Sequence, residues 1–183
     1  MESSSLNEEL LVVRLKPILV EYNNLFCDDE ERQALLLFLE TNDCRETVEK
    51  CVDGDDIANA FAHAGLKNHL DILQFFLDRG INIDIKNKFG DTALIKASAN
   101  GRKESVCMLL ERNANPNPQD KNGWTALMWS CRFGYKDIVQ SLLNNNADIE
   151  LKDDKGRTAF DNAKTEQIKE MIQNHVNTSY ILK

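Results

Sequence analysis

The sequence repeats itself with a period of 33 residues. The phrase Gly-x-Thr-Ala-apolar occurs three times, beginning at Gly90, Gly123 and Gly156. The same period relates two apolar triplets that follow it, Val106-Leu109-Leu110 and Val139-Leu142-Leu143. A fixed period of this size indicates stacked copies of one supersecondary unit, none of which can bury its apolar face alone.

Further positions recur in the same register. An Asp-like residue precedes each phrase, at Asn87, Asp120 and Asp153, and Gly101 and Gly134 lie between the two apolar stretches of their copies. Together these residues resemble the ankyrin repeat over about 57–175. The resemblance implies an all-α solenoid of helix-turn-helix units with short β-hairpin-like tips.

The pattern divides the chain into a cap, an array and a tail. We expect an acidic N-terminal helical cap over 1–56 and a flexible tail over 176–183. The expected array comprises 57–87, 88–120, 121–153 and a C-terminal cap, 154–175. In the C-terminal cap the apolar residues arrive four positions earlier than the period requires, which we interpret as a shortened turn between its helices.

Helical signals also occur in the N-terminal region. A capping box at Ser5 predicts a helix through Val13, and apolar residues at helical spacing predict another over 33–40. A shorter helix is expected over 45–52. The last two resemble a degenerate repeat without its tip, as expected for the end of a solenoid.

Two departures from the ankyrin pattern stand out. The usual His of the first helix is replaced by Ile95, Met128 and Asp161, so the family's inter-repeat hydrogen bonds from that residue are lost. One tip contains Pro116 and Pro118, each of which lacks a backbone N–H. We expect that tip to be irregular and to make fewer backbone hydrogen bonds.

Charge is unevenly distributed along the chain. Residues 1–56 contain 15 acidic and 5 basic side chains, whereas 57–183 contain 15 acidic and 17 basic. A dense acidic segment repels phosphate backbones, so nucleic acid is not an expected partner. The segment is interpreted as a solubilising surface; an alternative hypothesis is that it folds over the basic tips in a self-inhibited state.

The sequence also bears on location and chemistry. The longest apolar run is far shorter than the roughly 20 residues that a membrane-spanning helix needs, and the start lacks the features of a secretion signal. Five cysteines without a C-x-x-C pair favour a reducing compartment, cytoplasmic or nuclear. The histidines His63, His69 and His175 lack metal-ligand spacing, so neither metal, cofactor nor enzymatic activity is expected.

In ankyrin repeats the partner usually contacts the concave side, formed by the tips and the exposed side of each first helix. The resemblance therefore places candidate protein-binding residues there: Phe89, Asp91, Asn100, Trp124, Trp129, Arg132, Phe133 and Arg157. Aromatic and arginine side chains dominate binding hot spots. Trp129 has a second interpretation as a residue packed between helices. A basic row along the tips is interpreted either as solvated or as steering an acidic partner: Lys86, Lys88, Lys121, Lys152 and Arg157.

The sequence thus predicts a monomeric, non-catalytic adaptor or scaffold that binds a protein partner. The alternative is a regulatory inhibitor that covers the working surface of an enzyme. A purely structural subunit is a third interpretation, against which the net charge of −8 argues, because such charge favours solubility of the isolated chain.

Overall fold

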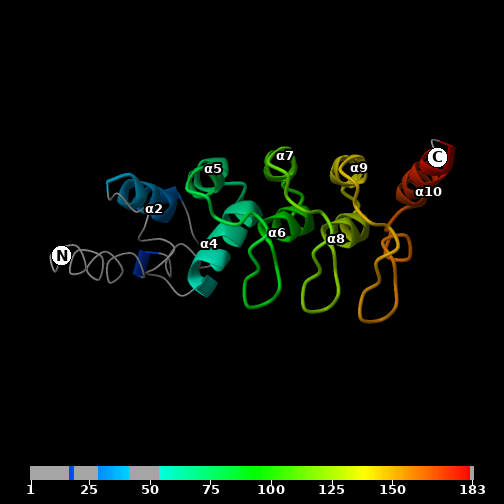
Figure 1. Cartoon of the computed structure of the whole chain (residues 1–183), viewed down its shortest axis with the longest axis horizontal. Helices are drawn as coiled ribbons and strands as arrows, with labels where there is room; N and C mark the ends of the chain where they lie inside the picture. The colour runs from blue at the N-terminus through cyan, green and yellow to red at the C-terminus, as the bar shows by residue number, and fades with distance from the viewer. Residues whose placement is uncertain (1–16, 19–28, 42–53, 182–183) are drawn as a thin grey trace.

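The computed structural model describes residues 17–18, 29–41 and 54–181. Its helices form two rows, one above the other, with loops extending below them (Figure 1). The inner row consists of α4 (Gly54–Lys67), α6 (Ala93–Ala99) and α8 (Ala126–Phe133). The outer row consists of α2 (Asp29–Thr41), α5 (Leu70–Asp78), α7 (Lys103–Glu111), α9 (Lys136–Asn144) and α10 (Glu166–Ile181).

The helices expected near the N-terminus are partly covered by this description. The helix predicted over 33–40 lies within α2, which confirms it, whereas those predicted over 5–13 and 45–52 fall outside the described residues. Helix α2 continues the outer row: Arg32 Nε donates to Asp71 of α5 at 3.1 Å. Its position is that of the second helix of a repeat.

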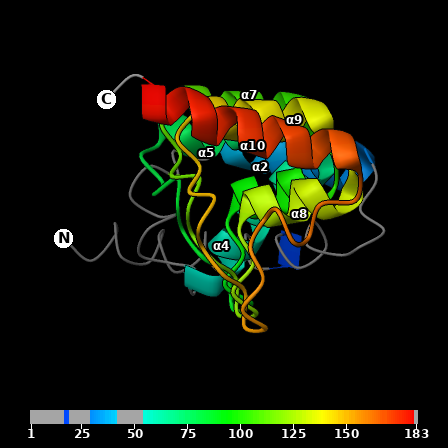
Figure 2. The ribbon, with the colours of Figure 1, turned by 90° about the vertical axis from the view of Figure 1, so that its right-hand side faces the viewer.

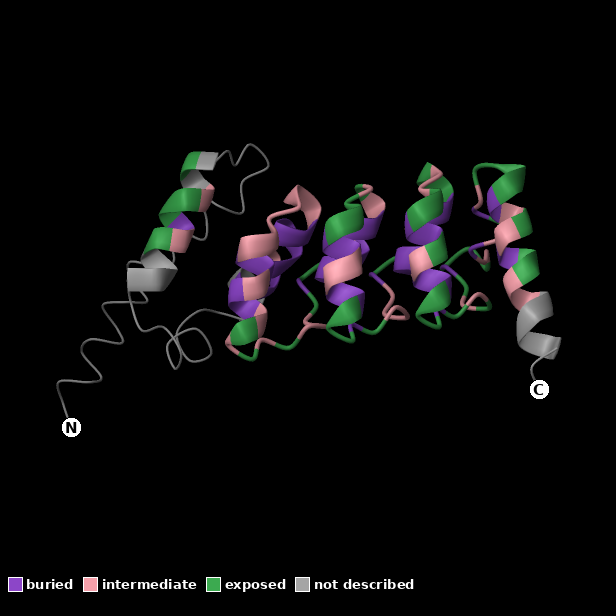
Figure 3. Cartoon of the chain, turned by 90° about the horizontal axis from the view of Figure 1, so that it is seen from above, coloured by how far each residue is buried: buried purple, intermediate pink, exposed green. Residues whose placement is uncertain are grey.

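Helices α6 and α8 of the inner row are capped by threonines, and small residues of the inner row are buried. The hydroxyls of Thr92 and Thr125 each accept a hydrogen bond from the backbone N–H three residues later, at 3.2 Å. Ala60 and Ala64 of α4 and Ala97 of α6 are fully buried, and α4 and α6 are in contact. Buried residues lie where neighbouring helices face each other, and exposed ones on the outer sides (Figure 3).

The loops that project from the helices, here called the tips (86–91, 119–124 and 152–157), share one construction. The side-chain oxygen of Asn87, Asp120 or Asp153 accepts the N–H groups two and four residues later, at 2.8 to 3.0 Å. Successive tips are joined by backbone hydrogen bonds from Lys121 N to Phe89 O, 3.0 Å, and from Asp154 N to Asn122 O, 3.1 Å. The described residues contain no β-strand, so the tips are hydrogen-bonded loops; seen along the array they nearly superpose (Figure 2).

The departures from the family pattern have local consequences. Ile95 and Met128, in place of the usual histidine, are buried in the core and contribute apolar contacts. In the proline-containing segment, Asn117 Oδ1 accepts the N–H of Asp148 at 2.7 Å, as Asp84 accepts that of Asn115 one repeat earlier, at 3.0 Å. Side-chain hydrogen bonds thus join the proline-containing segment to the repeat before it, through Asp84, and to the repeat after it, through Asp148.

The C-terminal cap is shortened differently from our expectation. We expected a clipped turn between two helices; instead the first helix is reduced to a turn over 159–162, and α10 follows directly. Lys164 N donates to Cys131 O at 3.0 Å and joins the cap to α8. Helix α10 extends to Ile181, past residue 176, at which we expected the tail to begin.

Candidate functional site

Most of the predicted binding residues lie on one surface, here called the tip-side face. It is formed by the tips together with the sides of α4, α6 and α8 that the outer row leaves uncovered. The other two faces of the inner helices are occupied by their neighbours and by the outer row. The tip-side face is therefore where side chains of the inner helices can reach a partner.

Four aromatic side chains form a continuous row across this face, here called the aromatic row. The ring centroids of Trp124 and Trp129 are 4.5 Å apart, and Trp129 stacks on Phe133 at 5.8 Å with 9° between the ring planes. Phe133 contacts Tyr135 at 6.0 Å. The row runs from a tip, along α8, to the turn that follows α8. Phe133 is 44% exposed, a large fraction for an aromatic ring of this size.

One buried carboxylate fixes both tryptophans. Asp120 Oδ1 accepts the backbone N–H of Trp124 at 3.0 Å, and Asp120 Oδ2 accepts the indole N–H of Trp129 at 3.1 Å. Trp129 is consequently half-buried with a satisfied indole nitrogen. Trp129 packs against the hydrophobic core and also lines a cavity on the tip-side face, so its contact with a partner stays a prediction.

The neighbouring tip contributes an arginine that is held in the same way. Arg157 donates from Nε and Nη2 to Asp153 Oδ2, at 2.9 and 2.7 Å, and its guanidinium lies 5.6 Å from the centroid of the Trp124 ring. Burial acts to raise the pKa of Asp153, but hydrogen bonds from the Arg157 side chain and from the backbone outweigh it and lower the pKa to about 2. The pair therefore stays ionised above that pH.

A cavity of about 420 Å³ lies between these groups. Two walls are aromatic, from Trp124 and Trp129, and the rim is polar and mainly basic. The remaining lining residues are Asn122, Arg132, Asp153, Asp154, Lys155 and Arg157. Aromatic walls with charged groups around them suit an apolar side chain of a partner protein that is flanked in the partner's sequence by charged residues.

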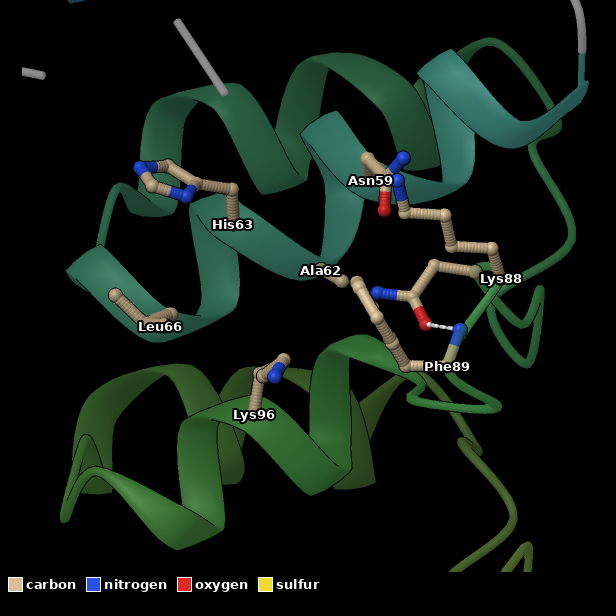
Figure 4. Close-up of a pocket in the computed structure, with 8 residues that line it drawn as sticks. Asn59, Ala62, His63, Leu66, Lys88, Phe89 and Lys96 are labelled. Carbon is tan, nitrogen blue, oxygen red and sulfur yellow. Dashed lines mark hydrogen bonds between the residues drawn. The ribbon is translucent and has the colours of Figure 1, made fainter. Parts of the chain in front are cut away.

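A second cavity, of about 350 Å³, lies near the other end of the array (Figure 4). Phe89, 55% exposed, points toward Ala62 of α4, with Lys88 beside it (Figure 4). The cavity is also lined by Leu66 and His63. Burial and, secondarily, the positive charges of Lys67, His69 and Lys96 lower the pKa of His63 to about 4, so it is neutral at physiological pH.

The structure gathers some predicted residues and separates others. Trp124, Trp129, Arg132 and Arg157 surround one cavity, with Phe133 stacked beside it, whereas Phe89 belongs to the second cavity. Asn100 is exposed at the end of α6, where its side chain donates to Lys96 O at 2.8 Å.

Asp91 requires a correction. It is only 6% exposed, because its side chain forms an ion pair with Lys96 of α6 at 2.8 Å. The residue at this position folds back toward the first helix of its own repeat. We therefore leave Asp91 out of the proposed binding surface.

Two contributors were missed at the level of sequence. Tyr135 extends the aromatic row, and its nearness to Phe133, two positions earlier, was the available signal. Asp120 was identified only as a family position; its second oxygen, directed at Trp129 nine residues later, depends on the path of α8 and had no sequence signal.

Other chemistry was sought in the part of the chain that the structure describes. There, no group of three or more potential ligands could hold a metal ion, and no helix has the length and apolarity to cross a bilayer. Cys131 is buried, which raises the pKa of its thiol to about 12, whereas Cys107 is half-buried.

Comparison with known proteins decides the family. A family model described as "Ankyrin repeats (3 copies)" matches residues 27–120, 60–153 and 113–177. The chain belongs to the ankyrin-repeat family. Ankyrin repeats are protein–protein interaction modules, and the match indicates no enzyme family. The first of the three matches to the family model begins at residue 27 and so includes α2, in agreement with a degenerate first repeat.

A solved structure supports the fold. The crystal structure of the ankyrin repeat domain of Bcl-3, described as a unique member of the IkappaB protein family, is 26% identical with a TM-score of 0.62. The similarity covers 68% of this chain and 57% of that chain. No curated protein sequence matches this chain.

Proposed function

We propose that this chain is a non-catalytic adaptor or scaffold that binds a protein partner through the tip-side face. The observation that carries the proposal is the aromatic row. Trp129 contacts Trp124, stacks on Phe133 and donates its indole N–H to the buried Asp120, while Phe133 remains substantially exposed. Aromatic side chains that are already ordered lose little conformational entropy on binding.

The proposal assigns distinct roles to the parts of the chain. Residues 57–175 form the array that presents the binding surface, and 1–56 form an acidic N-terminal cap. We further propose a monomer that acts in the cytoplasm or nucleus. Because hydrogen bonds between tips and between outer helices join each repeat to the next, the surface behaves as one unit.

Affinity capture from native lysate tests the proposal. Three baits are compared: wild type, Trp124→Ala/Phe133→Ala, and a control double variant, Gln140→Ala/Asn144→Ala. The control residues lie exposed on the outer helix α9, and their side chains hydrogen-bond to each other. Circular dichroism must show that all three are folded. We expect a partner captured by the wild type and the control but lost from the aromatic variant.

A partner retained by the aromatic variant and lost from the outer-helix control would contradict the proposed surface. The captured protein also separates the two modes of action. An adaptor is expected to hold two proteins at once, whereas a regulatory inhibitor is expected to lower the turnover of a captured enzyme. Either mode uses the same face.

A further inference from the structure

The two cavities on the tip-side face occupy equivalent positions two repeats apart. Residues that line the cavity beside α4 recur 66 positions later in the lining of the cavity beside α8. The equivalent pairs are His63 and Trp129, Leu66 and Arg132, Asn87 and Asp153, Lys88 and Asp154, and Phe89 and Lys155. Each cavity thus lies between an inner helix and the tip of the following repeat.

The equivalent position of the repeat between the two cavities carries lysines. One period from His63 stands Lys96, one period from Leu66 stands Ala99, and one period from Lys88 stands Lys121. Lys121 is exposed on its tip, and Lys96 reaches Asp91. Lys121 therefore lies between the two cavities, whereas Lys96 lines the cavity beside α4 and is paired with Asp91.

The tips carry an excess of positive charge, although the whole chain has a net charge of −8. Their basic residues are Lys86, Lys88, Lys121, Lys152, Lys155 and Arg157, and their acidic residues are Asp91, Asp120, Asp153 and Asp154. Three of the four acidic residues are buried; only Asp154 is exposed. Each buried carboxylate is engaged within the tips or with a basic side chain. The exposed charge is therefore mostly positive.

Geometry sets the length of a ligand that could use both cavities. Neighbouring helices pack roughly 8–10 Å apart, so two repeats span about 18 Å. An extended peptide advances about 3.3 Å per residue, so about five or six residues cover that span.

We propose that the tip-side face binds one extended acidic segment of a partner protein. An apolar side chain of the segment occupies each cavity, the two being about five or six positions apart, and an acidic side chain between them faces Lys121. The inference rests on the proposed function and specifies its ligand. Charge complementarity favours this occupant over a basic or neutral one.

Selection from phage-displayed random dodecapeptides tests the proposal on the full chain. The expected peptides carry two apolar residues about five or six positions apart with Asp or Glu between them. Enrichment of basic peptides, or of peptides with a single apolar residue, would overturn the inference. If no peptide is enriched over the Trp124→Ala/Phe133→Ala variant, the proposed function fails as well.

Binding of the most enriched peptide, synthesised with a fluorophore, is then measured by anisotropy. We expect Lys121→Glu to weaken binding at least tenfold, and the matched reversal Lys136→Glu, at an exposed position of outer helix α9, to change it less than twofold. Removing three residues between the apolar positions should also weaken binding at least tenfold. Equal effects of the two reversals would overturn the inference while leaving dependence on the aromatic row intact. If the chain instead forms dimers that the peptide dissociates, the tip-side face binds a second copy of this chain, and the inference is wrong.

Discussion

At the scale of single residues, one polar group often performs two tasks. Asn87 and Asp120 both organise a tip by accepting two backbone N–H groups through one oxygen. Asn87 has no second side-chain oxygen, whereas Oδ2 of Asp120 accepts the indole N–H of Trp129 at 3.1 Å. Asparagine can therefore support a tip, but at position 120 its amide would direct a donor at the indole donor.

This difference gives a double-mutant prediction. We expect Asp120→Asn to lower the free energy of unfolding by about 1 to 2 kcal/mol, because two donors would then face each other in a half-buried site. In a Trp129→Phe background, where the indole N–H is absent, the same change should cost about 1 kcal/mol less. Urea denaturation of the four proteins measures the coupling. Additive losses would show that the hydrogen bond does not hold Trp129.

A second residue-scale prediction concerns His63. Its pKa of about 4 in the folded chain lies below the ordinary 6.5 of the unfolded chain. Between these values the unfolded state binds a proton that the folded state does not, so stability falls as pH decreases through this window. We expect the stability of wild type relative to His63→Gln to decrease by about 1 to 2 kcal/mol from pH 7 to pH 5.

Denaturation curves of both proteins at the two pH values measure this difference. Because the comparison is between variants at the same pH, titration of the many carboxylates cancels. A relative stability that is independent of pH would contradict the buried, neutral imidazole.

At the scale of elements, the tips show what joins one repeat to the next. Gly123 and Gly156 occupy the same tip position with φ of 76° and 75°. A Cβ on Gly123 would lie 2.9 Å from the backbone nitrogen of Asp154 in the following tip, whereas a Cβ on Gly156 would meet nothing within 4 Å. Conformation alone favours glycine at both positions, and close approach of a neighbouring tip favours it only at the first.

We accordingly predict different costs for the two alanine substitutions. Gly156→Ala should destabilise by about 1 kcal/mol, from the left-handed backbone conformation. Gly123→Ala should cost about 1 to 3 kcal/mol more, because the next tip must move. Thermal or chemical denaturation of the two variants measures the difference. Equal costs would contradict the close packing of successive tips.

Elements also show what sequence reasoning can and cannot supply. The period of 33 residues predicted α6 to α9 because tips, caps and core residues repeat together. The path of the C-terminal cap was not predictable in the same way, since a lost helix and a clipped turn shift the apolar residues equally. Side-chain positions, such as the burial of Asp91 beside Lys96 or the contact of Phe133 with Tyr135, depend on how tips and turns fold back within their own repeat and leave no periodic signal.

At the scale of the whole molecule, the array is a surface held in one shape by contacts between successive repeats. Outer helices are joined by pairs such as Lys103 and Asp137, 2.8 Å, and tips by backbone hydrogen bonds. Because each repeat contacts its neighbours, stability in such arrays is approximately a sum of repeat and interface terms. The proposed binding face, which spans several repeats, is thus ordered in the absence of a partner.

The sequence contains two tryptophans, Trp124 and Trp129, and both lie on the proposed binding face. Their emission therefore reports on that face alone, provided that the partner chosen has no tryptophan. The measurement that tests the central claim is acrylamide quenching of this emission, with and without a saturating amount of the captured partner. We predict a shift of the emission maximum to shorter wavelength and at least a twofold decrease in the quenching constant. Saturated binding that leaves both quantities unchanged would contradict the claim that the aromatic row binds the partner.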